Sequence, residues 1–181
     1  MKNKEKDNLF SILKNCRGQM LAETMVALGM VTIGLLGLLA LLSYSLALNK
    51  VVADQYIATY LATEGIEITK NILDNQIARG RGFGLGEGYF EADFNSSELF
   101  FLSKDKTQAQ SSARSFYFDS VSKRYSYQAG SQSQTTPFRR IIRLQQLNNP
   151  EKIVVNSIVF WKTRNQGSFE INLEDHFFNW K

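Results

Sequence analysis

Hydrophobic and polar positions divide the chain into regions of different periodicity. From Thr24 to Asn49 no residue is charged, none is proline, and most are Leu, Ala, Val, Met, Ile or Gly. A helix over this run would be about 39 Å long, whereas the hydrocarbon core of a bilayer is about 30 Å thick. An uncharged run of this length is not typical of a buried helix in a soluble protein, so we expect residues 19–49 to form a membrane-spanning helix.

A helical periodicity follows Lys50. Apolar positions recur at spacings of three and four residues, as on one face of an α-helix, while charged residues occupy the other positions. The apolar positions are Ile57, Leu61, Gly65, Ile68 and Ile72, and the charged ones are Asp54, Glu64, Glu67, Lys70 and Asp74. The pattern predicts an amphipathic continuation of the helix over residues 50–78. Glycines at every second position from Gly80 to Gly88 then predict a loop over residues 79–88.

The remainder, residues 89–181, has the pattern of a β-rich globular domain. Aromatic and β-branched residues predict strands in five runs, which are residues 115–120, 123–128, 138–147, 153–163 and 168–173. Residues 129–136, rich in Ser, Gln and Thr, are expected to form a loop, and residues 163–167 a hairpin turn. Strands that follow a helix as a block, without βαβ alternation, indicate an α+β fold. The predicted architecture is a long N-terminal helix, half membrane-spanning and half amphipathic, followed by a small antiparallel sheet.

The net charge of the 181 residues is +4, with 21 Lys and Arg against 17 Asp and Glu. Five of the basic residues and two of the acidic ones lie in residues 1–18, and from Gln19 onward 16 basic and 15 acidic residues remain. Positive charge on one side of a membrane helix keeps that side in the cytoplasm. We therefore expect a cytoplasmic N-terminus and an exported C-terminal domain, and we interpret most of the basic charge as a topology signal.

Side chains for catalysis or metal binding are scarce. Cys16 is the only cysteine and His176 the only histidine, so neither a disulfide within the chain nor a zinc site of several Cys and His residues can form. The glycine series lacks the spacing of phosphate-binding loops. We expect no catalytic residues, no metal site and no cofactor, and we interpret the chain as a structural protein and not as an enzyme.

Arg139, Arg140 and Arg143 lie close together on a predicted strand and form a candidate weak basic patch for nucleic acid. Alternation along the strand would place Arg139 and Arg143 on one face and Arg140 on the other. We therefore expect solvated strand faces, and nucleic acid is the less favoured partner.

A specific motif stands before the apolar run. The sequence Cys16-Arg17-Gly18-Gln19-Met20-Leu21-Ala22-Glu23-Thr24 joins a basic leader that ends in Gly18 to a carboxylate five positions later, at the start of the uncharged helix. This segment resembles the prepilin-type cleavage and methylation site of type IV pilins and type II secretion pseudopilins. Residues 33–38 and 61–67, and the end of the chain from Val159 to Trp180, are most similar to PilV-like minor pilins.

The resemblance implies a pilin-like fold and a defined route of processing. A prepilin peptidase would remove the leader, residues 1–18, by cutting after Gly18, and Gln19 would be N-methylated, although an N-terminal Gln can also cyclise. In the family, the carboxylate at the position of Glu23 meets the N-terminal amine of a neighbouring subunit and sets the axial register. Because the helix lacks proline, Gly29, Gly34 and Gly37 are the positions at which it could bend or partly melt.

The implied partners are the prepilin peptidase, membrane lipid before assembly, and other pilin subunits in a filament. The chain would lie in the cytoplasmic membrane as a single-pass protein and then in a filament at the cell surface. Two alternatives remain open: a membrane-anchored extracytoplasmic binding domain, and a DNA-binding minor pilin of a competence filament. The sequence does not distinguish a type IV pilus, a type II secretion pseudopilus and a competence filament, or a major from a minor subunit.

Overall fold

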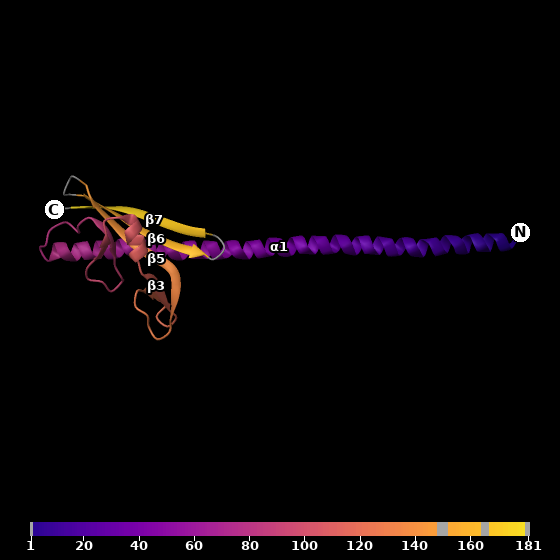
Figure 1. Ribbon diagram of the computed structural model, residues 1–181, viewed down its shortest axis with the longest axis horizontal. Coiled ribbons are helices and arrows are strands. Elements are labelled where there is room, and N and C mark those ends of the chain that lie inside the picture. The colour runs from indigo at the N-terminus through magenta and orange to yellow at the C-terminus, as the bar shows by residue number, and fades with distance from the viewer. Residues whose placement is uncertain (1, 148–151, 164–166, 180–181) are drawn as a thin grey trace. The chain divides into compact units, whose positions relative to one another are not determined.

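The computed structural model describes residues 2–147, 152–163 and 167–179, with side chains from residue 18 onward. One long helix, α1 (Lys2–Ala78), is followed by an antiparallel sheet, which confirms the predicted α+β fold class (Figure 1). The chain separates into two compact units, Met1–Val52 and Ala53–Lys181. Side chains of the predicted leader before Gly18, and residues 164–166 of the predicted hairpin turn, lie outside the described residues.

The first unit consists of helix in its described part. From Gly18 to Lys50 every residue is exposed except Gly29, which is half-buried, and this part of α1 is long and apolar enough to cross a membrane. The hydroxyls of Thr24, Thr32 and Ser43 donate to main-chain oxygens of α1 itself, at 2.8–2.9 Å. These polar groups are thus satisfied without water or a neighbouring chain, which is what hydrocarbon requires.

The second unit begins with the amphipathic part of α1. Its predicted apolar face is confirmed, because Leu61, Gly65, Ile68 and Ile72 are buried and Ile57 is half-buried. The helix ends at Ala78, and Gly80 and Gly82 follow with φ angles of 70° and 86°. L-residues with a side chain rarely adopt this left-handed region, so the glycines allow the chain to turn away from the helix.

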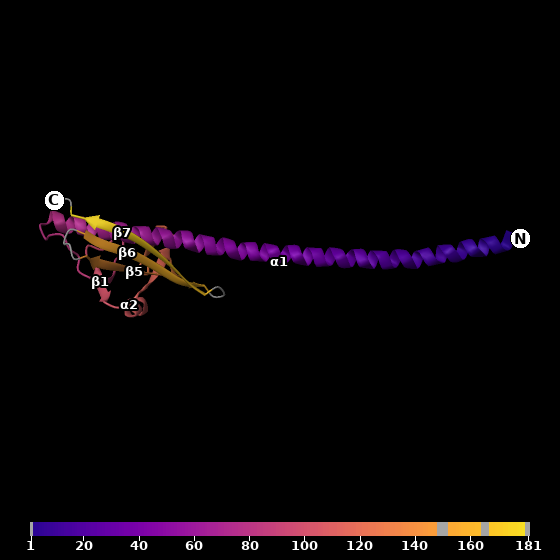
Figure 2. The same cartoon turned by 90° about the horizontal axis from the view of Figure 1, so that it is seen from above.

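The sheet has seven strands among the described residues, all paired antiparallel: β1 (Gly88–Glu91), β2 (Phe100–Ser103), β3 (Ser115–Asp119), β4 (Arg124–Ser126), β5 (Ser133–Gln146), β6 (Lys152–Thr163) and β7 (Gly167–Phe178). Strand β5 is central. One of its edges pairs with β6, which pairs with β7, and its other edge pairs with β1 and β3. Strand β2 lies beside β1, and β4 beside β3. Figure 2 shows β5, β6 and β7 in this order.

Two predicted loops were too long. The Ser/Gln/Thr-rich loop ends earlier than predicted because Ser133, Gln134 and Thr135 already pair with β3. The glycine-rich loop loses its last residue to β1, where Gly88 pairs with Leu144 of β5. Pairing with a distant strand decides the structure of both segments.

Helices cover both faces of the sheet. The second half of α1 packs on one face through two apolar clusters, one around Ile68, Ile72 and Leu73 and the other around Leu61 and Phe116. A smaller cluster on the other face includes Ala109 and Ala113, at the short helix α2 (Lys106–Ser112) that the sequence analysis missed. Asp105 caps α2 by accepting from the Thr107 amide at 2.9 Å.

Candidate functional site

The residues of the predicted processing motif all lie on α1. Gly18, Gln19 and Glu23 are exposed, and a β-carbon at Gly18 would meet nothing within 4 Å. Five residues of helix separate Gly18 from Glu23 by about 7.5 Å along the axis. No cation of the described side chains forms an ion pair with Glu23. The carboxylate at the start of the apolar run is therefore available to a group outside the described part of the chain.

The three predicted points of helix flexibility are α-helical. Gly29, Gly34 and Gly37 continue α1 without a break, and a β-carbon at any of them would meet nothing within 4 Å. Packing inside the molecule therefore does not require glycine at these positions. Any requirement for glycine there would come from a partner or from a change in the helix itself.

The structure does not form the predicted basic patch. Arg139 is half-buried beside Ser115, with 3.3 Å between Nε and the serine Oγ, and Arg143 lies over the ring of Tyr89 at 5.9 Å. Arg140 is fully buried on the opposite face of the sheet, toward α1, so its interpretation as a solvated residue was wrong. Charge alone suggested exposure, but both terminal nitrogens of this guanidinium bond to partners on distant segments, while its Nε has no hydrogen-bond partner among the described residues.

Arg140 connects three segments in the core. Its Nη1 donates to the main-chain oxygen of Leu61 at 2.6 Å and to Oε2 of Glu64 at 3.0 Å, and its Nη2 donates to the main-chain oxygen of Ala92 at 2.8 Å. The planar guanidinium can bind several acceptors in fixed directions, which an ammonium group cannot do. Arg140 therefore fixes α1 and the segment after β1 to the central strand.

The close approach of Arg140 depends on a glycine. A β-carbon on Gly65 would lie 2.9 Å from Cδ of Arg140 and would collide with Oγ of Ser157. Gly65 is positioned between the α1 residues of the two apolar clusters, Leu61 and Ala62 on one side and Ile68 and Ile72 on the other. A glycine within an apolar helix face, and an arginine within an apolar strand, were the sequence signals for this contact.

A stack of charged and aromatic groups continues from Arg140. Its guanidinium lies 5.0 Å from the ring centre of Phe116, which stacks on Tyr127 at 4.4 Å, and Arg114 lies 4.6 Å from the Tyr127 ring. Glu91, which is buried, accepts from the Arg114 amide at 2.7 Å and from its Nε at 2.8 Å. Burial raises the pKa of the Tyr127 hydroxyl, which donates to the main-chain oxygen of Arg140 at 3.4 Å.

These buried groups do not form a metal centre. Among the side chains that the structure describes, no three of His, Cys, Asp and Glu come together closely enough to hold an ion. The buried Glu91 already accepts from Arg114 through both of its carboxylate oxygens. The arrangement is therefore suited to holding segments together.

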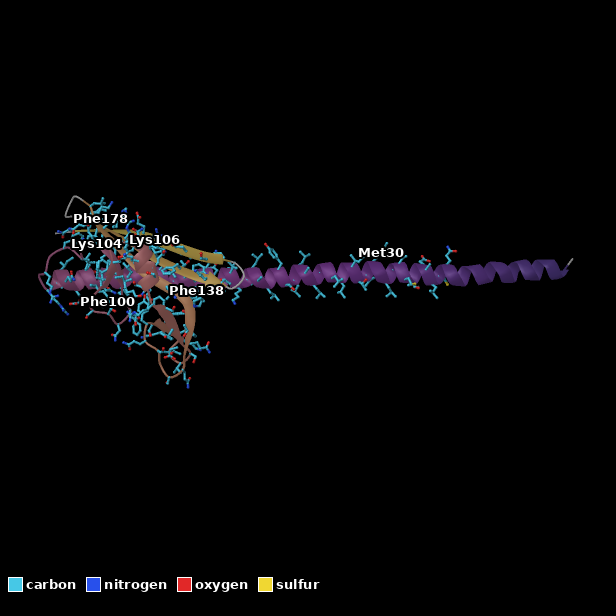
Figure 3. The ribbon with its side chains drawn as sticks, in the orientation of Figure 1. Met30, Phe100, Lys104, Lys106, Phe138 and Phe178 are labelled. Atoms are coloured by element: carbon cyan, nitrogen blue, oxygen red, sulfur yellow. The ribbon has the colours of Figure 1, made fainter. Side chains whose placement is uncertain are left out.

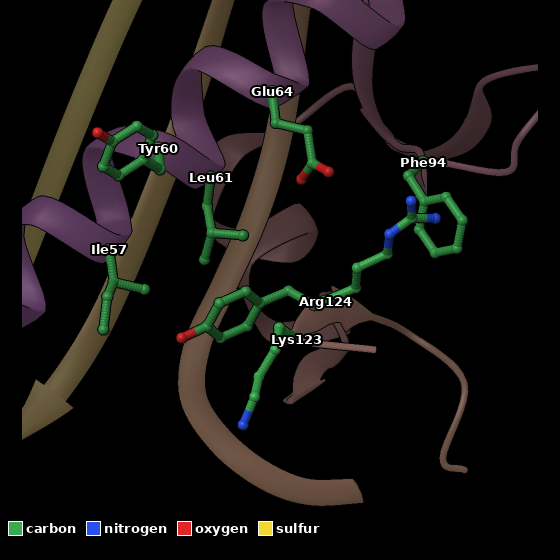
Figure 4. A pocket seen from close by; sticks show the side chains of 8 residues that line it. Ile57, Tyr60, Leu61, Glu64, Phe94, Lys123 and Arg124 are labelled. Carbon is green, nitrogen blue, oxygen red and sulfur yellow. The ribbon is translucent and has the colours of Figure 1, made fainter. Parts of the chain in front are cut away.

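A cleft on the second unit combines aromatic and charged side chains. Its volume is about 590 Å³, and its lining comes from α1, from the segment after β1 and from the start of β4 (Figure 4). The lining residues are Ile57, Tyr60, Leu61, Glu64, Phe94, Lys123, Arg124 and Tyr125. The guanidinium of Arg124 lies over the ring of Phe94 at 5.5 Å. This cleft is named the aromatic groove below.

Comparison with protein-family models, with curated proteins and with solved structures finds no match for this chain. Its function is therefore inferred from its own residues and their arrangement.

Proposed function

We propose that this chain is a pilin-like structural subunit, most similar to minor pilins, of a type IV pilus or a related filament. It is processed after Gly18, methylated at Gln19, held in the cytoplasmic membrane by the apolar part of α1, and assembled through that helix. One observation carries the proposal. The exposed, uncharged helix begins one residue after Glu23, whose carboxylate has no ion pair among the described side chains.

The apolar part of α1 needs apolar surroundings on every side. Leu, Met, Val and Ile side chains of this part are exposed all around the helix, so water is an unfavourable environment for it. Lipid satisfies the requirement before assembly. A bundle of the same helices in a filament satisfies it equally well, so transfer from membrane to filament need not expose the apolar surface.

Glu23 gives this transfer a direction and a register. A carboxylate near the centre of a bilayer costs about 2.5–3.5 kcal/mol on insertion scales, whereas a residue at the interface costs much less. An amine of a neighbouring subunit would offset part of the cost of burying Glu23 in a helix bundle, because the two charges would pair. The sheet domain, joined to the exported end of α1, would then lie on the filament exterior.

The cleavage is tested by mass spectrometry of membrane fractions from the native host. We expect the N-terminus at Gln19 in the wild-type chain, and an uncut chain when Gly18 is replaced by a bulky residue in Gly18→Val. An intact leader on the wild-type chain would contradict the proposal, and so would a cut after Ala47, near the end of the apolar run, where removal of an ordinary secretory signal would leave the N-terminus. An intact leader would favour the alternative of a membrane-anchored extracytoplasmic binding domain.

The role of Glu23 is tested by recovery of the chain in filaments sheared from cells. Glu23→Ala should be cleaved normally but should be depleted from the sheared fraction, because the charge that pairs with the neighbouring amine is gone. Glu23→Asp, which keeps the charge on a shorter side chain, is the matched control and should retain part of the recovery. Normal recovery of Glu23→Ala would show that the carboxylate has no role in assembly.

A further inference from the structure

The aromatic groove is apolar at its floor and aromatic at its rim. Leu61 is buried and Ile57 and Tyr125 are half-buried, while Tyr60 and Phe94 are 77% and 46% exposed. Figure 4 shows the side chains of α1 on one side and Arg124 with Phe94 on the other. A cleft of about 590 Å³ is large enough for more than one aromatic side chain. Its shape and lining thus suit an aromatic residue of a partner chain.

The charge of the groove restricts its occupant further. Lys123 and Arg124 form no ion pair with any carboxylate of the described residues. The carboxylate in the lining, Glu64, already accepts from the buried Arg140 at 3.0 Å. Asp119, the cross-strand neighbour of Arg124, acts on Lys123 only through space and forms no ion pair with it. The rim therefore carries two cations without a direct ion pair, and an occupant with an aromatic side chain next to a carboxylate would complement it.

The same domain exposes such a segment. Phe100 and Phe101 at the start of β2 are 66% and 49% exposed, and Glu98 precedes them (Figure 3, where Phe100 is labelled). Strand β2 pairs only with β1 in the described sheet, so this edge is open. Glu98 contacts Arg81 at 3.8 Å, and both side chains are largely exposed. A surface ion pair of this kind is worth at most about 1 kcal/mol, so Glu98 can exchange partners at little cost.

We propose that the aromatic groove of one copy of this chain receives Glu98 and Phe100 of a second copy. Phe100 fills the space between Tyr60 and Phe94, and Glu98 pairs with Lys123 or Arg124. The proposal rests on the proposed function, in which filament subunits lie side by side, and it requires that two such neighbours be copies of this chain. It names a contact between sheet domains that the packing of N-terminal helices does not by itself provide.

The contact must be intermolecular. Glu98 lies beside α1 residues 72–79, whereas the groove lies at residues 57–64. Phe100 is held in β2 opposite Glu91 of β1, and neither Phe100 nor Glu98 lines the groove of its own chain. Because groove and segment are different surfaces, each copy can give one contact and receive another, and such contacts propagate along an assembly unless they close into a ring.

Cysteine cross-linking in the native host tests the proposal on the full-length chain. The chain has one cysteine, Cys16, so Cys16→Ser gives a background without thiols. In this background Tyr60→Cys and Phe100→Cys should give disulfide-linked dimers and higher species on mild oxidation. The matched control combines Phe100→Cys with Lys70→Cys, since Lys70 is also exposed on α1 but lies outside the groove. Yields no higher than the control, or Tyr60→Cys joined only to another protein, would overturn the proposal.

Charge reversal adds a test in which a rescued yield cannot be explained by a folding defect. Arg124→Glu should lower the yield of cross-linked dimer about tenfold, and Glu98→Arg in the same chain should restore it, because the pair is then reversed. Failure of this rescue would also count against the contact. Sheared filaments without the cross-link would refute the contact but leave the filament function standing. A cross-link in membranes of cells without filaments would support the contact but refute the filament function.

Discussion

Gly65 of α1 and Arg140 of β5 approach so closely that a β-carbon on the glycine would lie 2.9 Å from Cδ of the arginine. Gly65→Ala should therefore lower the free energy of unfolding of the sheet domain by about 1–3 kcal/mol, as overpacked core positions do. The loss should occur although alanine favours helix over glycine by about 1 kcal/mol. Tryptophan fluorescence during denaturation of the detergent-solubilised chain measures it, since Trp161 is buried in the core.

Gly34→Ala is the matched control for this change. It adds the same methyl group to the same helix, but a β-carbon at Gly34 meets nothing within 4 Å. The stability of the sheet domain should not change in this variant. Equal stability of Gly65→Ala and wild type would show that α1 can shift on the sheet and that the close contact is not required.

Arg140→Met should destabilise the sheet domain by about 3 kcal/mol. The change leaves the main-chain oxygen of Ala92 without this donor, removes a second donor from the helical Leu61 oxygen and removes the partner of Glu64. Glu64→Gln should cost only about 1 kcal/mol, because this side chain is 36% exposed and water can replace the lost charge pairing. Urea denaturation of both variants gives the comparison, and similar losses would show that the ion pair, and not the buried main-chain acceptors, dominates.

The burial of the Tyr127 hydroxyl predicts that the folded domain loses stability at alkaline pH. Burial raises the pKa of its hydroxyl, so the folded state holds this proton more tightly than the unfolded state. The contribution is complete below the ordinary tyrosine pKa of about 10 and declines as the pH rises above it. The melting temperature of Tyr127→Phe should therefore fall less steeply between about pH 10 and 11.5 than that of wild type. Parallel curves would contradict the assignment, and Tyr60→Phe, at an exposed position, is the control.

The structure predicts where a soluble fragment must begin. Residues 53–181 form one compact unit, and residues of α1 such as Leu61, Ile68 and Ile72 complete its core. A fragment of residues 53–181 should be soluble and show cooperative unfolding. Residues 79–181, which lack this helix, should aggregate or show no cooperative transition, because the helix-facing side of the sheet is exposed. Cooperative unfolding of the shorter fragment would show that α1 is dispensable for the fold.

The helix and the longer strands could be predicted because their signals are local. Both halves of α1 follow from uncharged or periodic positions, and the strands rich in aromatic residues follow from composition. Strands β1 and β2 have four residues each and exist because β1 pairs with β5 far along the chain. The start of β5 at Ser133 likewise depends on its pairing with β3. Such pairings leave no local pattern in sequences this short.

The burial of Arg140 was not predictable from charge. Its acceptors lie 79, 76 and 48 residues away in the sequence. Single positions gave only indirect signs, namely Gly65 on an apolar helix face and Arg140 between apolar strand residues. The aromatic groove has the same character, since its residues come from α1, the segment after β1 and the start of β4. By contrast, the predicted processing motif around Gly18 and Glu23 is contiguous, so it could be recognised without knowledge of the fold.

The fit of Gly65 against Arg140 also has a mechanical consequence. Within the second unit, a force along the axis of α1 would act on the contact between this helix and the sheet. To yield by sliding, the helix would have to advance by one turn on the sheet. Leu61 or Thr69 would then replace Gly65 opposite Arg140, and both carry side chains that this position cannot hold. Gly65 therefore resists sliding of the helix along the sheet in both directions.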